Sequence, residues 1–219
     1  MAEILLVRHA QASFGEADYD RLSALGWQQA RWLGEYFAER AARFDLVVRG
    51  SLRRHAETLA GIAEGYGEAL EAREDPRLDE YDSHALLAAW TRGAGLATAD
   101  RRAHFRALRE AMYAWTEGRL EGAAHEPFAD FRARVLAALE DLRRSGAGRI
   151  LVVTSGGPIA TMLAEVLSMP ARGMVDLNLQ TRNTGVSELR AGARAVRCVS
   201  FNTIPHLDRP DRAGALTYA

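Results

Sequence analysis

An imidazole and a guanidinium stand side by side near the start of the chain, as Arg8 and His9. They directly follow Ile4 to Val7, a continuous apolar run with the length of a strand that is covered on both faces. Ligands of open α/β sheets bind just beyond the carboxyl ends of such strands. An imidazole there can attack phosphorus while its second nitrogen is held by a hydrogen bond, and a neighbouring guanidinium can bind phosphoryl oxygens. By itself, an Arg-His pair is more often an ordinary surface feature at the end of a strand.

A second cationic segment follows another apolar run, Asp45 to Val48. The residues after it place a further arginine, Arg53 or Arg54, at the beginning of an expected helix. A helix N-terminus offers unpaired N–H groups and the positive end of a dipole to an anion. Two arginines that converge on one imidazole indicate a phosphate site.

A carboxyl group that could serve the same site lies in the acidic loop Pro76 to Asp82, after an expected third strand. Glu80 could protonate a leaving alkoxide if burial and a neighbouring phosphate raise its pKa. Taken alone, Glu80 is equally typical of a solvated acid in an acidic loop.

The elements that must position these residues alternate between strands and helices. Apolar residues at helical spacing predict helices, and short apolar runs predict strands. The predicted helices cover residues 24–40, 52–66, 129–144 and the segment after Pro158, and the predicted strands include 4–7, 45–48, 150–153 and a late hairpin of 186–190 and 195–201. This alternation predicts one α/β domain over residues 1–219, a three-layer α/β/α sandwich whose central sheet is mostly parallel with an antiparallel edge strand.

The segment from Ser83 to Glu126 does not follow this alternation. Its composition is largely helical, and we expect a helical insertion at residues 83–126 that covers one end of the sheet. Insertions of this kind act as lids that set substrate choice, but a packing elaboration without such a role is an equally good interpretation.

With these segments in place, the chain resembles the histidine phosphatase superfamily, the phosphoglycerate mutase-like proteins, nearly from end to end. Five motifs carry the resemblance in the family's order. Leu5 to Gln11 is similar to the nucleophile signature, Leu22 to Ala30 to the first-helix signature, Leu52 to Thr58 to Leu-x-Arg-x-x-Gln/Glu-Thr, Leu78 to Glu80 to Leu-x-Glu, and Asn202 to Leu207 to the closing Asn…His-Leu.

The resemblance implies roles for four residues. His9 would be the nucleophile, and Glu80 the proton donor to the leaving group. Arg8 and Arg54 would bind the phosphoryl group, since the motif selects Arg54 rather than Arg53.

The resemblance also places Gln11 and Ser13 in the loop after the nucleophile, where they either contact phosphate or shape the turn. It implies no metal and no other cofactor. The remaining histidines of the first 150 residues do not have the spacing of a metal site; they are His55, His84, His104 and His125.

The chain departs from the family pattern at the turn after the strand 150–153. The family places a second histidine there, followed by two glycines, whereas this chain has Ser155 before Gly156 and Gly157. The family's histidine supplies a hydrogen bond, often with positive charge, to the phosphoryl group, and a serine supplies one neutral hydrogen bond. Loss of one such donor costs about 2.7–4 kcal/mol of transition-state stabilisation.

This departure has three interpretations. The site could be intact but slower, with Ser155, Gly156 and the helix N-terminus holding the anion. Another histidine, such as His84, could supply the missing group. The chain could instead bind a phosphorylated ligand without turning it over. We favour the first, because two glycines at this turn let the backbone approach phosphate closely.

We therefore predict a phosphomonoester hydrolase that acts through a phosphohistidine intermediate on a small phosphorylated metabolite. A weak or inactive phospholigand-binding relative is one alternative. Phosphoglycerate mutase-type phosphotransfer is another, and it would need a cationic lining for a substrate carboxylate. The insertion offers four arginines for such a lining, although they could equally form a solvated helix face: Arg92, Arg101, Arg102 and Arg106. Arg182, before the late hairpin, is a further candidate for substrate contact.

A serine hydrolase centred on Ser155 is a rival of a different class. Its nucleophile elbow requires Gly two residues before the serine, and this chain has Val153 there. That hypothesis also leaves the two arginines unexplained.

The composition of the chain limits the classes of partner that we expect it to bind. The net charge of −1 gives no indication of nucleic acid, and no apolar stretch reaches the length of a membrane span. The single cysteine, Cys198, and the absence of a signal-peptide pattern favour a cytoplasmic location. We expect a small-molecule phosphate ester as the partner, with no nucleic acid or membrane, and a homodimer is compatible with the sequence.

Overall fold

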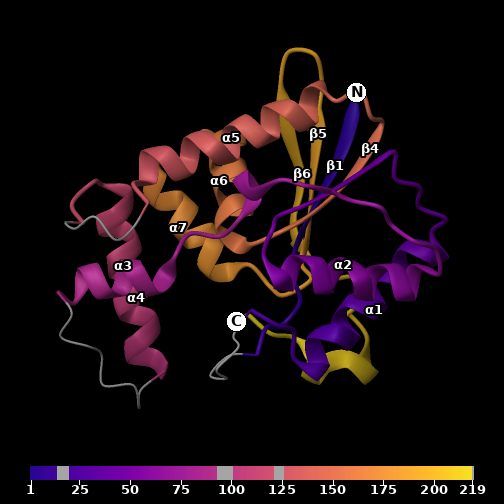
Figure 1. Ribbon diagram of the computed structural model, residues 1–219, viewed down its shortest axis with the longest axis horizontal. Helices are drawn as coiled ribbons and strands as arrows, with labels where there is room; N and C mark the ends of the chain where they lie inside the picture. Colours follow the sequence, from indigo (N-terminus) through magenta and orange to yellow (C-terminus); the bar gives the residue numbers. More distant parts are fainter. Residues whose placement is uncertain (14–19, 93–100, 121–125, 219) are drawn as a thin grey trace.

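The computed structural model describes residues 1–13, 20–92, 101–120 and 126–218 and centres on a six-stranded sheet (Figure 1). The strands lie in the order β3-β2-β4-β1-β5-β6. The first four in this order are parallel, and β5 and β6 add antiparallel pairings at one edge. Their bounds are β1 (Ala2–Arg8), β2 (Leu46–Arg49), β3 (Arg73–Glu74), β4 (Arg149–Thr154), β5 (Val186–Ala191) and β6 (Val196–Thr203). The mostly parallel sheet and the late hairpin confirm the prediction.

Helices cover both faces of the sheet, because alternate residues of the buried strands point to opposite sides. On one face, Leu5 and Val7 of β1 pack with α1 (Ala24–Glu39) and α2 (Arg53–Tyr66). On the other face, Ile4 and Leu6 pack with α5 (Phe128–Arg144), α6 (Gly156–Val166) and α7 (Ala171–Gln180). The continuous apolar run of β1 is therefore buried on both sides, as the three-layer sandwich requires.

Close contact between α1 and α2 fixes the helix that carries Arg54. Ser23 caps α1, and its hydroxyl accepts a hydrogen bond from the Gly26 N–H at 3.0 Å. A Cβ on Gly34 would lie 2.1 Å from the carbonyl oxygen of Ile62, so only glycine permits this approach.

Two helices differ from the sequence prediction. α6 begins at Gly156, before Pro158 rather than after it. A proline in the first turn of a helix lacks only an N–H that would be unpaired in any case. No helix was expected over α7, because its ten residues include Gly173 and several polar side chains and bury few apolar ones, among them Met174 and Val175.

Two helices occupy most of the described part of the segment 83–126. α3 (Ser83–Trp90) and α4 (Arg101–Thr116) lie beside α7 and away from the β5–β6 hairpin (Figure 1). Trp115 and Met112 of α4 belong to the same core cluster as Phe131 of α5. These helices therefore share the core of the sandwich.

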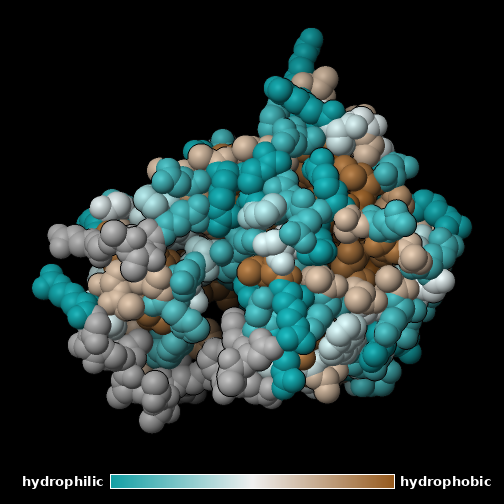
Figure 2. Space-filling model, viewed as in Figure 1, coloured by the Kyte–Doolittle hydropathy of each residue, from teal (hydrophilic) through white to brown (hydrophobic). Residues whose placement is uncertain are grey.

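Hydrophilic side chains cover most of the face seen in Figure 2, and hydrophobic ones gather in smaller patches. Within the described residues, none of the helices is both long enough and apolar enough to span a bilayer.

Candidate active site

His9 lies at the carboxyl end of β1, where the strand geometry fixes its backbone. Its N–H donates to the carbonyl of Thr154 at 2.8 Å, and its side chain is 3% exposed. Nδ1 lies 2.8 Å from the carbonyl oxygen of Ala10. A carbonyl can only accept, so Nδ1 carries the hydrogen and Nε2 keeps the lone pair that a nucleophile needs.

Two guanidinium groups lower the pKa of this imidazole. Burial first, and then the charges of Arg54 and Arg8, hold the pKa of His9 well below its ordinary value. His9 is therefore neutral at neutral pH. A neutral nucleophile between two cations is suited to a phosphate dianion, whose charge the arginines can balance.

Each arginine is held by the chain around it. Arg8 donates through Nη1 to the carbonyls of Thr181 and of Tyr218, the latter at 2.6 Å. Arg54, 8% exposed near the beginning of α2, donates through Nη1 to Oδ1 of Asp20 at 2.5 Å. Sequence reasoning missed Asp20, which gives Arg54 a carboxylate partner.

The turn from β4 to α6 brings Ser155, Gly156 and Gly157 to the same place. A Cβ on Gly156 would lie 2.3 Å from Oδ1 of Asn178 and 3.7 Å from Nε of Arg8. The backbone of this turn is therefore close to the Arg8 guanidinium, and it is packed too tightly for a side chain at position 156.

Glu80 reaches this turn from the loop that follows β3. Both of its carboxylate oxygens accept from the Gly157 N–H at 3.1 Å. Burial raises the pKa of Glu80, while the Gly157 hydrogen bond and the charges of Arg54 and Arg8 oppose the rise. A raised pKa keeps a larger fraction of this carboxyl protonated near neutral pH, as a proton donor requires.

A histidine that the sequence analysis did not select lies beside Ser155. His55, in the first turn of α2, is fully buried, and its Nε2 lies 2.8 Å from Oγ of Ser155. Its ring centroid is 5.9 Å from that of His9. The available signal was its position next to Arg54 in the motif. His84, the histidine considered in its place, is exposed on α3.

Gln11 and Ser13 hold the loop after the nucleophile. Oε1 of Gln11 accepts from the Ser23 hydroxyl at 2.7 Å, and the N–H of Ser13 donates to the carbonyl of Arg21 at 2.9 Å. These contacts attach the loop to its return segment and to α1, which supports a turn-shaping role for both residues.

Two further residues, also missed, hold the backbone next to His9. Asn183 donates through Nδ2 to the His9 carbonyl at 3.1 Å. Thr58 of α2 accepts from the Ala10 N–H at 3.0 Å and donates to the Arg54 carbonyl at 2.6 Å. The two catalytic candidates His9 and Arg54 are thus connected through one threonine.

Other sequence candidates lie elsewhere or outside the described residues. Arg182 donates through Nη1 to the carbonyl of Asn202 at 3.2 Å, which ties it to β6. Arg92 and Arg106 are exposed on the helical segment 83–126. The side chains of Arg101 and Arg102 lie outside what the structure describes. Among the described residues, no group of three or more His, Cys, Asp or Glu side chains is placed to hold a metal ion.

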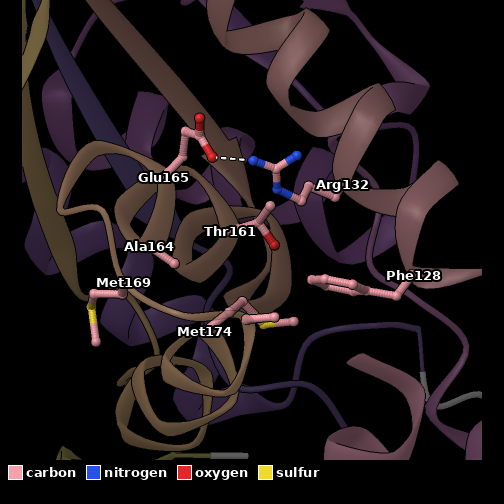
Figure 3. A pocket seen from close by; sticks show the side chains of 8 residues that line it. Phe128, Arg132, Thr161, Ala164, Glu165, Met169 and Met174 are labelled. Atoms are coloured by element: carbon pink, nitrogen blue, oxygen red, sulfur yellow. Dashed lines mark hydrogen bonds and ion pairs between the residues drawn. The ribbon is translucent and has the colours of Figure 1, made fainter. Parts of the chain in front are cut away.

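A separate pocket of about 170 Å³ lies between α5, α6 and α7 (Figure 3). Arg132 and Glu165 form an ion pair at this pocket, where they neutralise each other (Figure 3). Its lining consists of Phe128, Arg132, Thr161, Ala164, Glu165, Met169, Ala171 and Met174. None of the residues predicted to act on phosphate belongs to it, so the pocket is not the predicted site.

Comparisons with known proteins bear on the family and the fold of this chain. A sequence model described as the histidine phosphatase superfamily (branch 1) matches residues 4–204. A protein of Hydrogenobacter thermophilus named "Putative phosphoserine phosphatase 2" is 25% identical over 216 residues, which span 94% of this chain and 98% of that protein. The mycobacterial glucosyl-3-phosphoglycerate phosphatase structure is 24% identical with a TM-score of 0.67, over 93% of this chain and 99% of that one. The alpha-ribazole phosphatase structure from Shigella flexneri is 20% identical with a TM-score of 0.65, over 92% and 96%. These two structures share the fold.

Proposed function

Because this chain belongs to the histidine phosphatase superfamily, we propose that it hydrolyses a small phosphorylated metabolite through a phosphohistidine intermediate. The observation that carries the proposal is the state of His9. Its imidazole is buried and neutral, its Nδ1–H is held by the Ala10 carbonyl, and the charges of Arg8 and Arg54 act on it.

In the first step, Nε2 of His9 attacks phosphorus and the ester P–O bond breaks. Glu80, as the carboxylic acid, gives its proton to the leaving alkoxide, so the alcohol departs neutral. Arg8 and Arg54 bind the non-bridging oxygens and balance their charge.

In the second step, water attacks phosphorus and the P–N bond to His9 breaks. The Glu80 carboxylate takes a proton from the water, which restores the acid and releases inorganic phosphate. One carboxyl group thus serves both steps, and the reaction as proposed uses only side chains of this chain.

Binding without turnover is the second candidate, because the motif resemblance places Ser155 where the family has a histidine. Mutase-type transfer has less support, since the arginines that could contact a substrate carboxylate are exposed, are tied to β6, or have side chains that the structure does not describe. A serine hydrolase is disfavoured. The His55 ring lies between the Ser155 hydroxyl and the Asp79 carboxylate, as in a catalytic triad. However, Oδ1 of Asp79 is 3.6 Å from Nδ1 of His55, which is too far for the hydrogen bond of a triad.

The test is release of inorganic phosphate by the wild type and by His9→Ala. The esters should include an aryl phosphate, phosphoserine, which the name of the Hydrogenobacter relative suggests, and a phosphorylated glyceric acid. A chelator should be present throughout. Turnover that survives the chelator and is lost in His9→Ala supports the proposal.

The control is binding of inorganic phosphate to the same proteins by calorimetry. A folded wild type that binds phosphate but hydrolyses none of the esters would favour the binding-only candidate. Turnover that persists in His9→Ala would exclude His9 as the nucleophile.

A further inference from the structure

The proposed reaction leaves one buried imidazole beside the nucleophile without a role. His55 is fully buried, and its pKa is held well below its ordinary value by burial and by the charges of Arg54 and Arg49. It is therefore neutral, with one nitrogen that donates and one that accepts. Nε2 lies 2.8 Å from Oγ of Ser155, a hydrogen-bond distance between two fully buried side chains.

The Ser155 hydroxyl does not cap the helix that follows it, although its position suggests that role. Ser155 is the N-cap of α6, and serine at an N-cap commonly accepts from a backbone N–H of the first turn. Within the described residues its side chain makes no such capping bond, and it pairs with His55 instead. Helix capping therefore does not explain why the hydroxyl is held here.

The loop after β2 leaves space for the imidazole. A Cβ on Gly50 would lie 2.3 Å from Nδ1 of His55 and 2.6 Å from Oδ1 of Asp79. Oδ1 of Asp79 accepts from the Ser51 N–H at 2.6 Å, which fixes the carboxylate on the far side of the ring from Ser155. His55 is thus enclosed on one side by this loop and directed at Ser155 on the other.

We propose that His55 is a positioning residue, which holds the Ser155 hydroxyl so that its hydrogen points at the phosphoryl group bound at His9. This inference rests on the proposed function, because it assigns a partner to the group that His9 attacks. The ring centroids of His55 and His9 are 5.9 Å apart, and the turn that contains Ser155 also lies next to Arg8. The hydroxyl therefore belongs to the same site as both groups.

The choice of tautomer follows from the charge of the ligand. If Ser155 donated to Nε2, it would present only lone pairs to a phosphate dianion. If Nε2–H donates to Oγ, the hydroxyl hydrogen is left for a phosphoryl oxygen, and a hydrogen bond to a charged acceptor is the stronger kind. This arrangement leaves Nδ1 of His55 as an acceptor 3.6 Å from Oδ1 of Asp79, so the hydrogen bond to the phosphoryl oxygen must outweigh that contact for the anion to select His55 Nε2–H to Ser155 Oγ–H to phosphoryl oxygen. An imidazole on α2 and a hydroxyl before α6 together provide one oriented donor.

A double-mutant cycle tests whether His55 acts through Ser155. The variants are His55→Ala, Ser155→Ala and the double variant, and the readouts are kcat and KM for an aryl phosphate. We expect each single variant to lower kcat about 10- to 100-fold. The kcat of the double variant should be no lower than that of the less active single variant. Losses that multiply in the double variant would overturn the proposal.

Two substitutions separate the hydrogen bond from packing. His55→Gln keeps an amide donor near Ser155 and should retain more of kcat than His55→Leu, which fills the space without a donor. Equal kcat in the two variants, with equal melting temperatures, would mean that His55 only fills space. His84→Ala is the control for an exposed histidine and should remain within about twofold of wild type.

The same cycle with orthovanadate binding, measured by calorimetry, needs no turnover. Non-additive losses of vanadate affinity in a protein that hydrolyses nothing would keep the His55–Ser155 pairing and reject the hydrolase. Turnover that depends on His9 but does not change in His55→Leu would reject the pairing and keep the hydrolase.

Discussion

Both carboxylate oxygens of Glu80 lie 3.1 Å from the backbone nitrogen of Gly157. This contact joins the loop after β3 to the first turn of α6 and places the only acid of the proposed mechanism beside the turn proposed to bind phosphate. It also makes the acid sensitive to the residue at position 157.

Replacement of the acid should affect poor leaving groups most. In Glu80→Gln, we expect kcat for an alkyl phosphate to fall about 10²- to 10⁴-fold, because the alkoxide departs without a proton. An aryl phosphate, whose phenolate leaves without help, should lose less. Steady-state kinetics with the two esters check this, with the exposed Glu71→Gln as a matched control. Equal losses for both leaving groups would contradict the assignment of Glu80 as the acid.

A methyl group at position 157 should displace the acid without removing it. A Cβ on Gly157 would lie 2.1 Å from Oε1 of Glu80 and 2.8 Å from Cε1 of Tyr81. We expect Gly157→Ala to lower kcat for alkyl phosphates about tenfold or more, because misplaced catalytic groups lose much of their effect. Gly214→Ala, at a position with open space for a Cβ, should leave kcat unchanged. A Gly157→Ala protein with wild-type kcat would show that the Glu80 contact is dispensable.

The sequence predicted those parts of the molecule that local patterns determine. Apolar runs of strand length correctly predicted β1 and β4, and helical spacing predicted α1, α2 and α5 within one or two residues at their ends. α7 was missed because its buried residues are few. The partner of Ser155 was missed for a different reason. His55 is 100 positions away in the sequence, and only the packing of α2 against the β4–α6 turn brings the two side chains together.

A buried histidine should make the native state sensitive to acid. Burial, with the charge of Arg212, lowers the pKa of His206 to about 3. Between about pH 6.5 and pH 3 the unfolded chain binds this proton and the native protein does not. The free energy of unfolding should therefore fall as the pH falls through this range, by up to about 1.4 kcal/mol per pH unit from this one group.

Urea unfolding at several pH values between 7.5 and 5 measures this slope. The slope should decrease in His206→Gln, even though that variant loses the contact of Nε2 with Oγ1 of Thr184 at 2.8 Å. The exposed His84→Gln should keep the wild-type slope. Parallel curves for wild type and His206→Gln would contradict the buried, neutral state of His206.

Moving the imidazole from α2 to the β4–α6 turn should restore much of the kcat that is lost when His55 is removed. Ser155 and His55 are both fully buried and 2.8 Å apart at their polar atoms, so Ser155→His alone overpacks the site. We expect it to destabilise the protein by about 1–3 kcal/mol.

The double variant Ser155→His with His55→Ala frees the space of one ring and occupies it with the other. Its melting temperature should exceed that of Ser155→His, and its kcat should exceed that of His55→Ala, because an imidazole donor again faces the phosphoryl group. A double variant no more active than His55→Ala would mean that the site depends on the serine hydroxyl itself and that an imidazole at position 155 cannot replace the pair.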